Sequence, residues 1–167
     1  MDIETVVVGA GVVGLSVAVE LVQRGTEVLI LEQNRSIGTE TSSRNSEVLH
    51  AGLYYPKTWL KTQLCLEGKK KLSKFSLENE VPVLQCGKLI VATREEDLPK
   101  LKILHSQAQD NGLDEIQWLN TNQARDLEPQ LTCCGALYSP STSVIDSHAL
   151  RSEEHTSELQ SHVRNLV

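Results

Sequence analysis

The pattern of apolar and polar positions along the chain predicts an opening strand, a helix and a second strand. Residues 5–8 form a β-branched apolar run that is typical of a buried parallel strand. A helical pattern follows, with Val13, Val17 and Leu21 spaced on one face, and a glycine stands where the helix should end. A second apolar run at residues 27–31 completes the pattern. The start of the chain therefore predicts a βαβ unit.

The remainder of the pattern predicts a mixture of helices and short strands. We expect helices over residues 59–78, 96–109 and 120–127, and strands over residues 88–92 and 116–119. This order does not continue the βα alternation of the opening unit. The chain is therefore predicted to be α/β, with a Rossmann-like βαβ domain and the beginning of a second, α+β domain.

A glycine motif joins the first strand to its helix and indicates a dinucleotide. Gly9 permits a tight turn, Gly11 lets the backbone approach a pyrophosphate, and Gly14 lets the helix pack closely against the strand. The helix start then presents free N–H groups to the phosphates. Glu32 ends the second strand, where a carboxylate accepts hydrogen bonds from an adenosine ribose and disfavours a 2′-phosphate. The motif favours FAD or NAD over NADP.

Composition narrows the class of protein. The chain has 167 residues, 40% hydrophobic and 23% charged, with a net charge of −6, as expected of one globular domain. Lysine and arginine are scattered, so nucleic acid is not an expected partner. The longest apolar stretch, residues 6–19, is interrupted by glycines, so we expect neither a transmembrane segment nor a signal or transit peptide. Four cysteines lack metal-ligand spacing, so we expect reduced thiols and no metal site: Cys65, Cys86, Cys133 and Cys134.

The segment after the second strand separates FAD from NAD. An NAD-binding domain would continue with further βα units, whereas this chain enters a polar loop at residues 33–41. Small hydroxyl and amide residues follow ahead of an expected helix start, namely Thr41, Ser42, Asn45 and Ser46. Such residues hold phosphate oxygens through side chains and backbone N–H groups. We therefore predict that they contact the phosphates of FAD, and an ordinary capped helix is the alternative.

Two longer motifs carry a family resemblance. The pattern Asn-Ser-x-x-x-His-x-Gly-x-Tyr-Tyr ends at Tyr55, and Cys-Gly-Lys-Leu-Ile-Val-Ala occupies residues 86–92. With the glycine motif and Glu32, they resemble FAD-dependent L-2-hydroxyglutarate dehydrogenases, of the D-amino-acid-oxidase-like flavoprotein superfamily. The likeness covers about residues 3–150. It implies FAD as cofactor, a small-molecule 2-hydroxy acid as substrate, a respiratory electron acceptor and a mitochondrial location, with a cytoplasmic location as the alternative.

The resemblance also implies a division of the chain and a chemistry. Residues 3–55 would form the FAD-binding βαβ part, and about residues 82–145 would begin the substrate domain. The implied reaction oxidises L-2-hydroxyglutarate to 2-oxoglutarate, and His50 is the candidate general base because its pKa is near neutral. A structural histidine is the alternative. Arg44 and Lys61 are weaker candidates for pairing with a substrate carboxylate.

The C-terminal residues look foreign to this protein. Residues 151–162 match the in-frame translation of a common sequencing adapter. We therefore expect residues 151–167 to be an artefact, and the remaining chain to carry a net charge of −6 − (−1) = −5. A genuine polar amphipathic helix is the alternative. The substrate pocket and second FAD segment of the family would then lie beyond Leu150, so the fragment is expected to be inactive alone.

Two other functions remain open from the sequence. One is a sister flavoenzyme, such as an FAD-linked glycerol-3-phosphate dehydrogenase or an amine oxidase, which would share the glycine motif. Residues 53–55 and 86–89 favour the hydroxyglutarate enzymes over these relatives. The other is a non-enzymatic dinucleotide-binding module with a C-terminal interaction helix.

Overall fold

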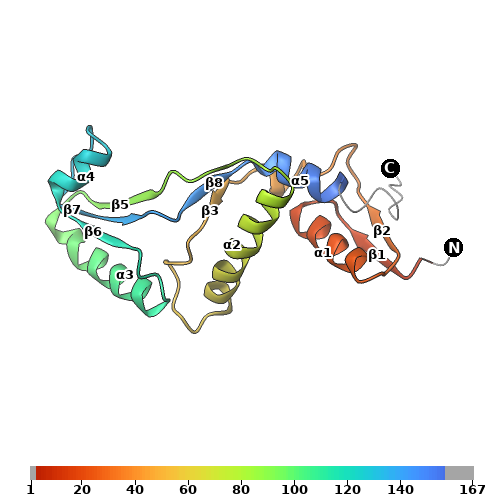
Figure 1. The fold of residues 1–167 in the computed structure, drawn as a ribbon, viewed down its shortest axis with the longest axis horizontal. Helices are drawn as coiled ribbons and strands as arrows, with labels where there is room; N and C mark the ends of the chain where they lie inside the picture. The colour runs from red at the N-terminus through yellow and green to blue at the C-terminus, as the bar shows by residue number, and fades with distance from the viewer. Residues whose placement is uncertain (1–2, 157–167) are drawn as a thin grey trace. The chain divides into compact units, whose positions relative to one another are not determined.

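A computed structural model describes residues 3–156 of the chain (Figure 1). The described residues form two compact units. Unit 1 comprises residues 3–47, 75–82 and 145–156, and unit 2 comprises residues 48–74 and 83–144. Helix α2, Leu60–Glu78, begins in unit 2 and ends in unit 1. Each unit is described by itself below.

Unit 1 contains the predicted βαβ element. Its strands and crossover helix are β1 (Thr5–Val8), α1 (Val12–Gln23) and β2 (Val28–Leu31). The strands pair in parallel, from Thr5 opposite Val28 to Val8 opposite Leu31. Helix α1 buries Leu15, Ala18 and Val19, and it ends just before Gly25, whose φ of 84° suits a glycine at a helix end. The predicted βαβ unit is confirmed.

The burial expected for β1 and α1 is wrong in part. β1 was expected to be buried, yet Val6 is 49% exposed and Val8 is 83% exposed. On α1, Val13 and Val17 do share a face, but both are exposed and lie opposite the core. A parallel strand is buried on both faces only when a layer covers each face. In the described part of unit 1, α1 covers one face of a two-stranded sheet.

The expected helix start after Ser46 does not form. The structure has one 3-10 turn, η1 (Thr41–Ser43), followed by the short strand β3 (Val48–Leu49). The Asn45 side chain donates to the Ser42 carbonyl oxygen at 2.8 Å and accepts from the Glu47 N–H at 2.7 Å. Asparagine side chains that bond the local backbone compete with helix formation. The helix prediction at this segment is therefore wrong.

Unit 1 ends with helix α5, Ser147–Thr156. Asp146 caps it, because one carboxylate oxygen accepts from the N–H groups of His148 and Ala149, both at 2.9 Å. α5 lies beside α1 within unit 1 (Figure 1). Residues 157–167, which include most of the suspected artefact, lie outside the described residues.

Unit 2 is built on antiparallel strand pairs. One sheet has the order β5–β7–β6, with β5 at Lys88–Ala92, β7 at Gly135–Ser139 and β6 at Gln117–Leu119. Strand β7 is central and pairs antiparallel with both neighbours. A second sheet has the order β3–β8–β4, with β8 at Ser143–Ile145 and β4 at Val83–Leu84. The predicted strands of the second domain are confirmed, whereas β7 was not predicted.

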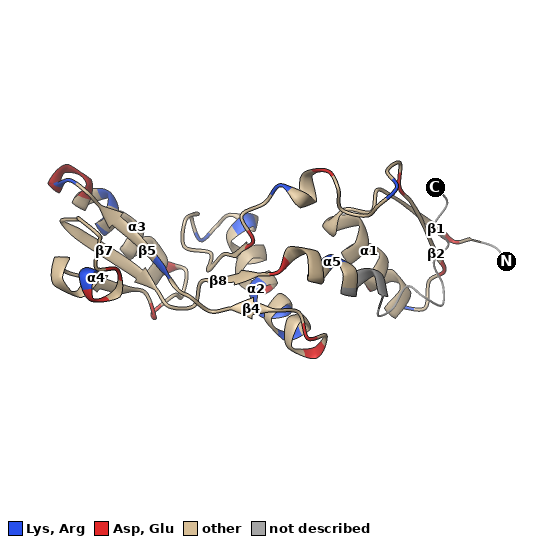
Figure 2. Cartoon of the chain, turned by 90° about the horizontal axis from the view of Figure 1, so that it is seen from above, with Lys and Arg blue, Asp and Glu red and all other residues tan. Residues whose placement is uncertain are grey.

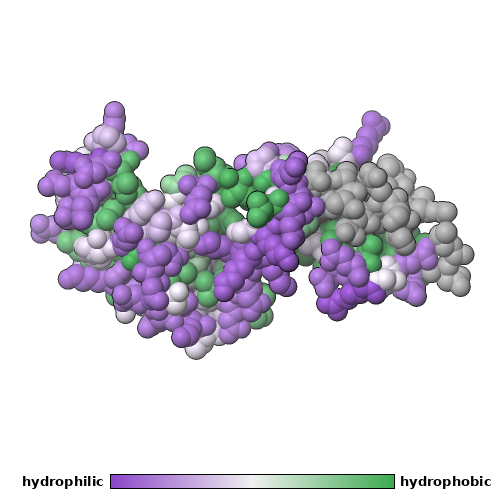
Figure 3. Space-filling view, viewed as in Figure 1, coloured by the Kyte–Doolittle hydropathy of each residue, from purple (hydrophilic) through white to green (hydrophobic). Residues whose placement is uncertain are grey.

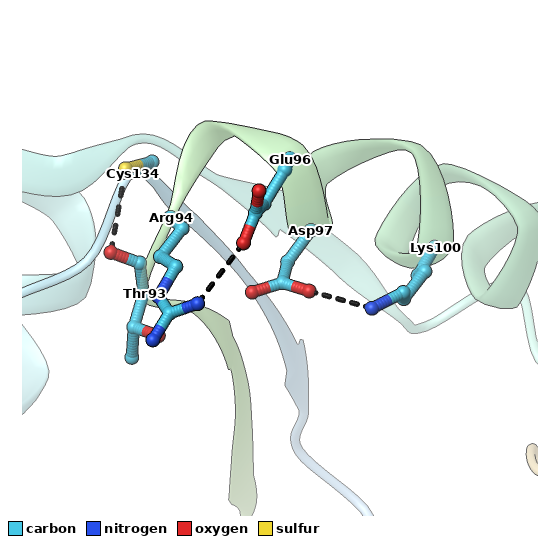
Figure 4. Close-up of polar contacts among 6 residues, drawn as sticks. All are labelled: Thr93, Arg94, Glu96, Asp97, Lys100 and Cys134. Carbon is cyan, nitrogen blue, oxygen red and sulfur yellow. Dashed lines mark hydrogen bonds and ion pairs between the residues drawn. The ribbon is translucent and has the colours of Figure 1, made fainter.

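Helices α3 and α4 of unit 2 begin in different ways, and only α4 has a side-chain cap. α3 (Leu98–Asp110) follows the 3-10 turn η2 (Glu95–Asp97), where Asp97 pairs with Lys100 at 2.8 Å (Figure 4). α4 (Thr121–Leu127) has a capping box between Asn120 and Gln123. Helices α2, α3 and α4 each carry both basic and acidic residues, which are coloured blue and red in Figure 2. Both predicted helices are confirmed.

The core of unit 2 gathers around β7. Ala136 and Leu137 have no exposed surface. Leu137 belongs to a buried cluster that includes Leu53, Leu101 and Ile116, so the cluster joins the central strand to α3 and to the loops before α2 and β6. The face of the molecule drawn in Figure 3 is largely hydrophilic, with small apolar patches. Unit 2 thus has a core of its own.

Residues 3–156 contain neither a membrane-spanning helix nor a cluster of metal ligands. None of the helices there is long and apolar enough to cross a bilayer. In the same residues, histidine, cysteine and acidic side chains do not gather into a group of three that could hold a metal ion. The four cysteines are all free thiols, and only Cys133 is buried.

Candidate functional site

The loop between β1 and α1 has a backbone that only glycine tolerates at two points. Gly9 has a φ of 98°, in the left-handed region, and its N–H donates to the Leu31 carbonyl oxygen at 2.7 Å. A Cβ at Gly14 would collide with the Gly9 carbonyl oxygen and lie 3.4 Å from a Val7 methyl group. The loop therefore stays close to the strand, and the first turn of α1 starts against it.

Ser42 is brought to this loop from 30 residues away. Its Oγ accepts a hydrogen bond from the Val12 N–H at 3.0 Å, and a Cβ at Gly11 would lie 2.9 Å from the same oxygen. A helix has no intrahelical acceptors for its first N–H groups, so those of Val13 and Gly14 are not used by the helix itself. Backbone donors and a hydroxyl group thus meet at the α1 N-terminus, which is the chemistry that binds phosphate.

Glu32 lies at the edge of the same loop. One carboxylate oxygen accepts from the Ala10 N–H and the other from the Asn34 N–H, both at 2.8 Å. The hydrogen bonds from Asn34 and then Ala10 lower the pKa of Glu32, so the group is ionised at neutral pH. Each oxygen retains a lone pair that can accept a ribose hydroxyl. Glu32 directly follows β2, so the structure confirms that it stands at the end of the second strand.

The other predicted phosphate contacts are arranged differently. Thr41 begins the η1 turn and is exposed, and Ser46 is also exposed. The Asn45 amide is already engaged with the Ser42 carbonyl, the Glu47 N–H and, at 3.4 Å, the Ser147 hydroxyl. The structure therefore brings Ser42 to the glycine loop, whereas Asn45 shapes the turn that carries Ser42.

Two contacts that support this turn were missed from the sequence. Arg151 is only 4% exposed, and its Nη1 donates to the Ser42 carbonyl oxygen at 2.8 Å. A Glu47 carboxylate oxygen accepts from the Ser147 hydroxyl at 2.7 Å and its N–H at 3.2 Å, and these bonds lower the pKa of Glu47. Both contacts join residues about a hundred positions apart, so no local pattern could have indicated them.

His50 lies in unit 2, directly after β3. Its neighbours Leu49 and Ala51 are buried, whereas the His50 side chain is exposed. Partial desolvation and the positive charges of Lys88 and Lys61 lower the pKa of His50. A lowered pKa keeps the imidazole neutral at physiological pH, and a neutral imidazole can accept a proton.

Two lysines of unit 2 each lie over a tyrosine ring. The Lys61 ammonium is 4.1 Å from the ring centroid of Tyr55, and the Lys88 ammonium is 4.7 Å from that of Tyr54. The phenol of Tyr55 raises the pKa of Lys61, so this lysine is firmly protonated. Lys61 was among the weaker sequence candidates, whereas Lys88 was not among the residues considered from the sequence.

Polar side chains at the end of α3 hold the loop that carries the two tyrosines, and one of them, Asn111, is buried. Asn111 donates to the carbonyl oxygens of Gly52 at 3.0 Å and Tyr55 at 2.9 Å. Gln107 donates to the Leu53 carbonyl oxygen at 2.8 Å. The loop is therefore fixed to helix α3, and unit 2 presents His50 and the lysines on a well-supported surface.

Known proteins resemble this chain over most of its length. The family described as "FAD dependent oxidoreductase" matches residues 4–153. "L-2-hydroxyglutarate dehydrogenase, mitochondrial" of Arabidopsis thaliana is 49% identical over 147 residues, which are 88% of this chain and 30% of that protein. The Caenorhabditis elegans protein of the same name is 37% identical over 145 residues, 86% of this chain and 34% of that protein. The chain thus spans about a third of the length of these relatives.

Solved structures resemble the fold. The L-alpha-glycerophosphate oxidase from Mycoplasma pneumoniae with FAD bound superposes with a TM-score of 0.90 at 26% identity, covering 97% of this chain and 44% of that one. Glycine oxidase from Geobacillus kaustophilus gives a TM-score of 0.87 at 22% identity, covering 98% of this chain and 46% of that one. The predicted α/β flavoprotein fold is confirmed.

Proposed function

The chain belongs to the FAD-dependent oxidoreductase family, and on that premise we propose that the full-length protein oxidises L-2-hydroxyglutarate to 2-oxoglutarate. The observation that supports this substrate is the 49% identity to the Arabidopsis thaliana protein named L-2-hydroxyglutarate dehydrogenase. That identity extends over 147 residues and therefore includes most of both described units.

The residues of unit 1 fit FAD. Gly11 and Ser42 would line the pyrophosphate, with the free N–H groups at the start of α1 as donors. Glu32, held ionised by the Ala10 and Asn34 amides, would accept the adenosine ribose hydroxyls. The proposed FAD-binding residues also include Thr41, Asn45 and Ser46, which lie close to Ser42 along the chain. When bound, FAD supplies the hydride acceptor for the oxidation.

The chain's own contribution to the chemistry is proton transfer at His50. A neutral imidazole accepts the proton of the substrate hydroxyl as the alcohol becomes a carbonyl. Partial burial lowers the pKa of His50, and the positive charges of Lys88 and Lys61 lower it further, so the imidazole stays neutral. Because the pKa of His50 lies below its ordinary value of 6.5, kcat/KM should already be at its plateau at neutral pH and fall in acid.

The cellular setting is proposed on the names of the relatives. The Arabidopsis thaliana, Caenorhabditis elegans and Nematostella vectensis proteins are named as mitochondrial. We place the full-length protein in the mitochondrion, with a respiratory electron acceptor. Fractionation of tissue, followed by detection with an antibody against unit 2, tests the location, and a purely cytosolic signal would contradict it.

We also propose that residues 1–150 are the N-terminal part of this enzyme and that residues 151–167 are an adapter artefact. The twelve-residue adapter match supports this. On this proposal the Arg151 contacts belong to the present chain and not to the natural protein. Sequencing the genomic locus across the Leu150 codon tests it, because a natural stop codon after the codons for 151–167 would overturn it.

The activity is tested with the full-length protein encoded at that locus. We expect FAD-dependent reduction of an artificial dye by L-2-hydroxyglutarate, and none by the D enantiomer. Glycerol 3-phosphate and glycine test the sister activities that the similar structures represent. Oxidation of either in place of L-2-hydroxyglutarate would refute the proposed substrate. Substrate-dependent dye reduction by the 167-residue chain alone would refute the expectation that it is inactive.

The role of His50 has a matched control in the same unit. His50→Gln should lower kcat by about a hundredfold or more, as expected for loss of a general base. His105→Gln should leave kcat close to wild type, because His105 contacts the Ile116 carbonyl oxygen and the edge of Trp118. Equal effects of the two substitutions, with FAD retained, would show that His50 is structural.

A further inference from the structure

We propose that Lys61 and Lys88 together form a carboxylate-binding site beside His50, and that this site selects a dicarboxylate over a monocarboxylate. The inference rests on the proposed function and deepens it by naming the groups that recognise the substrate. All of the residues involved belong to unit 2.

The two lysines come from distant parts of the chain to a pair of adjacent tyrosines that follows His50 by four and five residues. Lys61 lies in the first turn of α2 and over the Tyr55 ring, and Lys88 is the first residue of β5 and lies over the Tyr54 ring. Their positive charges also lower the pKa of His50, after the effect of its partial burial. Like charges repel, so this arrangement has an electrostatic cost when no anion is near. An anion bound at the cluster would remove that cost.

Neither lysine is neutralised by a carboxylate. Within residues 3–156, the ion pairs found do not include Lys61 or Lys88, and each ammonium group lies over a tyrosine ring instead. Lys100 shows the ordinary alternative, since it pairs with Asp97 at 2.8 Å. A tyrosine ring positions an ammonium group without cancelling its charge. Both lysines therefore remain able to bind an anion.

Several contacts fix the tyrosine loop on which the two ammonium groups lie. Tyr55 stacks on Trp59 at a centroid distance of 6.4 Å, and its carbonyl oxygen is held by Asn111. The Thr62 hydroxyl, which is buried, donates to the Pro56 carbonyl oxygen at 2.7 Å. Because the tyrosine loop is fixed before any ligand arrives, less conformational entropy is lost on binding.

The number of cations matches the number of charges on the substrate. L-2-Hydroxyglutarate carries two carboxylates, and its hydroxyl group is adjacent to one of them. One lysine would bind each carboxylate, which leaves the hydroxyl group to His50. A monocarboxylate would satisfy one lysine and leave the other unpaired beside His50. Two point charges therefore distinguish a short dicarboxylate from its monocarboxylate analogue.

The kinetic test uses the full-length protein loaded with FAD. Lys61→Gln and Lys88→Gln should each raise the KM for L-2-hydroxyglutarate by roughly ten- to a hundredfold, the range for loss of a charge-assisted hydrogen bond. Lys88→Arg should restore most of the loss, because it keeps the charge. Lys102→Gln, on exposed α3 of the same unit, is the matched control and should leave KM unchanged. KM values for the Lys61 and Lys88 variants equal to that of Lys102→Gln would overturn the proposal.

A binding test separates this proposal from the proposed activity. Perturbation of the flavin absorbance reports the affinities for glutarate and butyrate without turnover. Glutarate should bind at least tenfold more tightly than butyrate to the wild type, and this preference should vanish in the double variant. If L-2-hydroxyglutarate is not oxidised but the glutarate preference holds, the activity is wrong and the site stands. Equal affinities for glutarate and butyrate in the wild type would overturn the proposed site. This comparison needs only the wild-type protein, so it holds even if a lysine variant fails to bind FAD.

Discussion

The opening strand of unit 1 and the central strand of unit 2 are both short apolar segments, yet their surroundings differ. β7 pairs on both edges, and Leu137 has no exposed surface. Among residues 3–156, β1 pairs only with β2, and Val8 is 83% exposed. A two-stranded sheet covered on one face is rarely stable by itself. A sheet of three strands with a packed helix can be stable by itself.

The difference in burial between β7 and β1 shows which unit packs its strands more completely. Unit 2 encloses β7 between β5 and β6 and packs α3 beside them. Unit 1 concentrates its close contacts in the glycine loop, where Gly14, Ser42 and Glu32 meet the start of α1. We infer that unit 2 contributes most of the stability of this chain, and that unit 1 contributes the cofactor loop.

The largest expected effect comes from truncating the central strand. Leu137→Ala should lower the free energy of unfolding by about 2–5 kcal/mol, because it removes a fully buried side chain and leaves a cavity. Val8→Ala is the matched control in unit 1 and should change it by about 0.5 kcal/mol or less. Urea unfolding of the 167-residue chain measures both values. Similar losses for both variants would show that the two strands are equally packed.

A single methyl group in the glycine loop should have the next largest effect. Gly14→Ala places a Cβ against the Gly9 carbonyl oxygen, so the backbone must shift. We expect a loss of about 1–3 kcal/mol, as for other overpacked sites, together with much weaker FAD binding in the full-length protein. Gly11→Ala should cost less, because the Ser42 hydroxyl that it meets can rotate away. Urea unfolding and FAD titration rank the two variants, and the reverse order would refute this account of the loop.

A glycine-to-alanine substitution in unit 2 should change the free energy of unfolding in the opposite direction. A Cβ at Gly68, in the middle of α2, would meet nothing within 4 Å. Gly68→Ala should therefore raise the free energy of unfolding by about 0.5–1 kcal/mol, because alanine favours the helix. Circular dichroism during urea unfolding would measure this gain. A loss of stability would mean that α2 has a close neighbour at this position.

The smallest expected effect is the pH dependence of the stability that Glu32 contributes beside the glycine loop. The backbone N–H groups of Asn34 and Ala10 lower the pKa of Glu32 from 4.5, so the ionised form stabilises the folded state. That contribution is complete above pH 4.5 and is lost as the pH falls through the lower pKa of the folded state. The stability difference between wild type and Glu32→Gln should therefore shrink in acid. Unfolding midpoints measured across this range check it, and a pH-independent difference would contradict it.

Local patterns predicted the elements well where they depend on neighbouring residues. The glycine motif, the end of α1 at Gly25 and the cap of α4 at Asn120 all follow from residues within a few positions of one another. The helix expected after Ser46 was wrong because Asn45 bonds the backbone on both sides of itself. β7 was not predicted, although its Ala136 and Leu137 belong to a short apolar run. Short apolar runs do not distinguish strands from other buried segments.

By itself, the sequence determined the βαβ unit, the positions of Gly9, Gly14 and Glu32, and the family resemblance, because each depends on spacing along the chain. Only the tertiary structure decided that Ser42 meets the Val12 N–H, and that Lys61 and Lys88 lie over the rings of Tyr55 and Tyr54. Those contacts join residues between 6 and 34 positions apart, and the fold of each unit brings them together. Burial of β1 was likewise a tertiary matter, because a strand is covered only by the layers that pack on it.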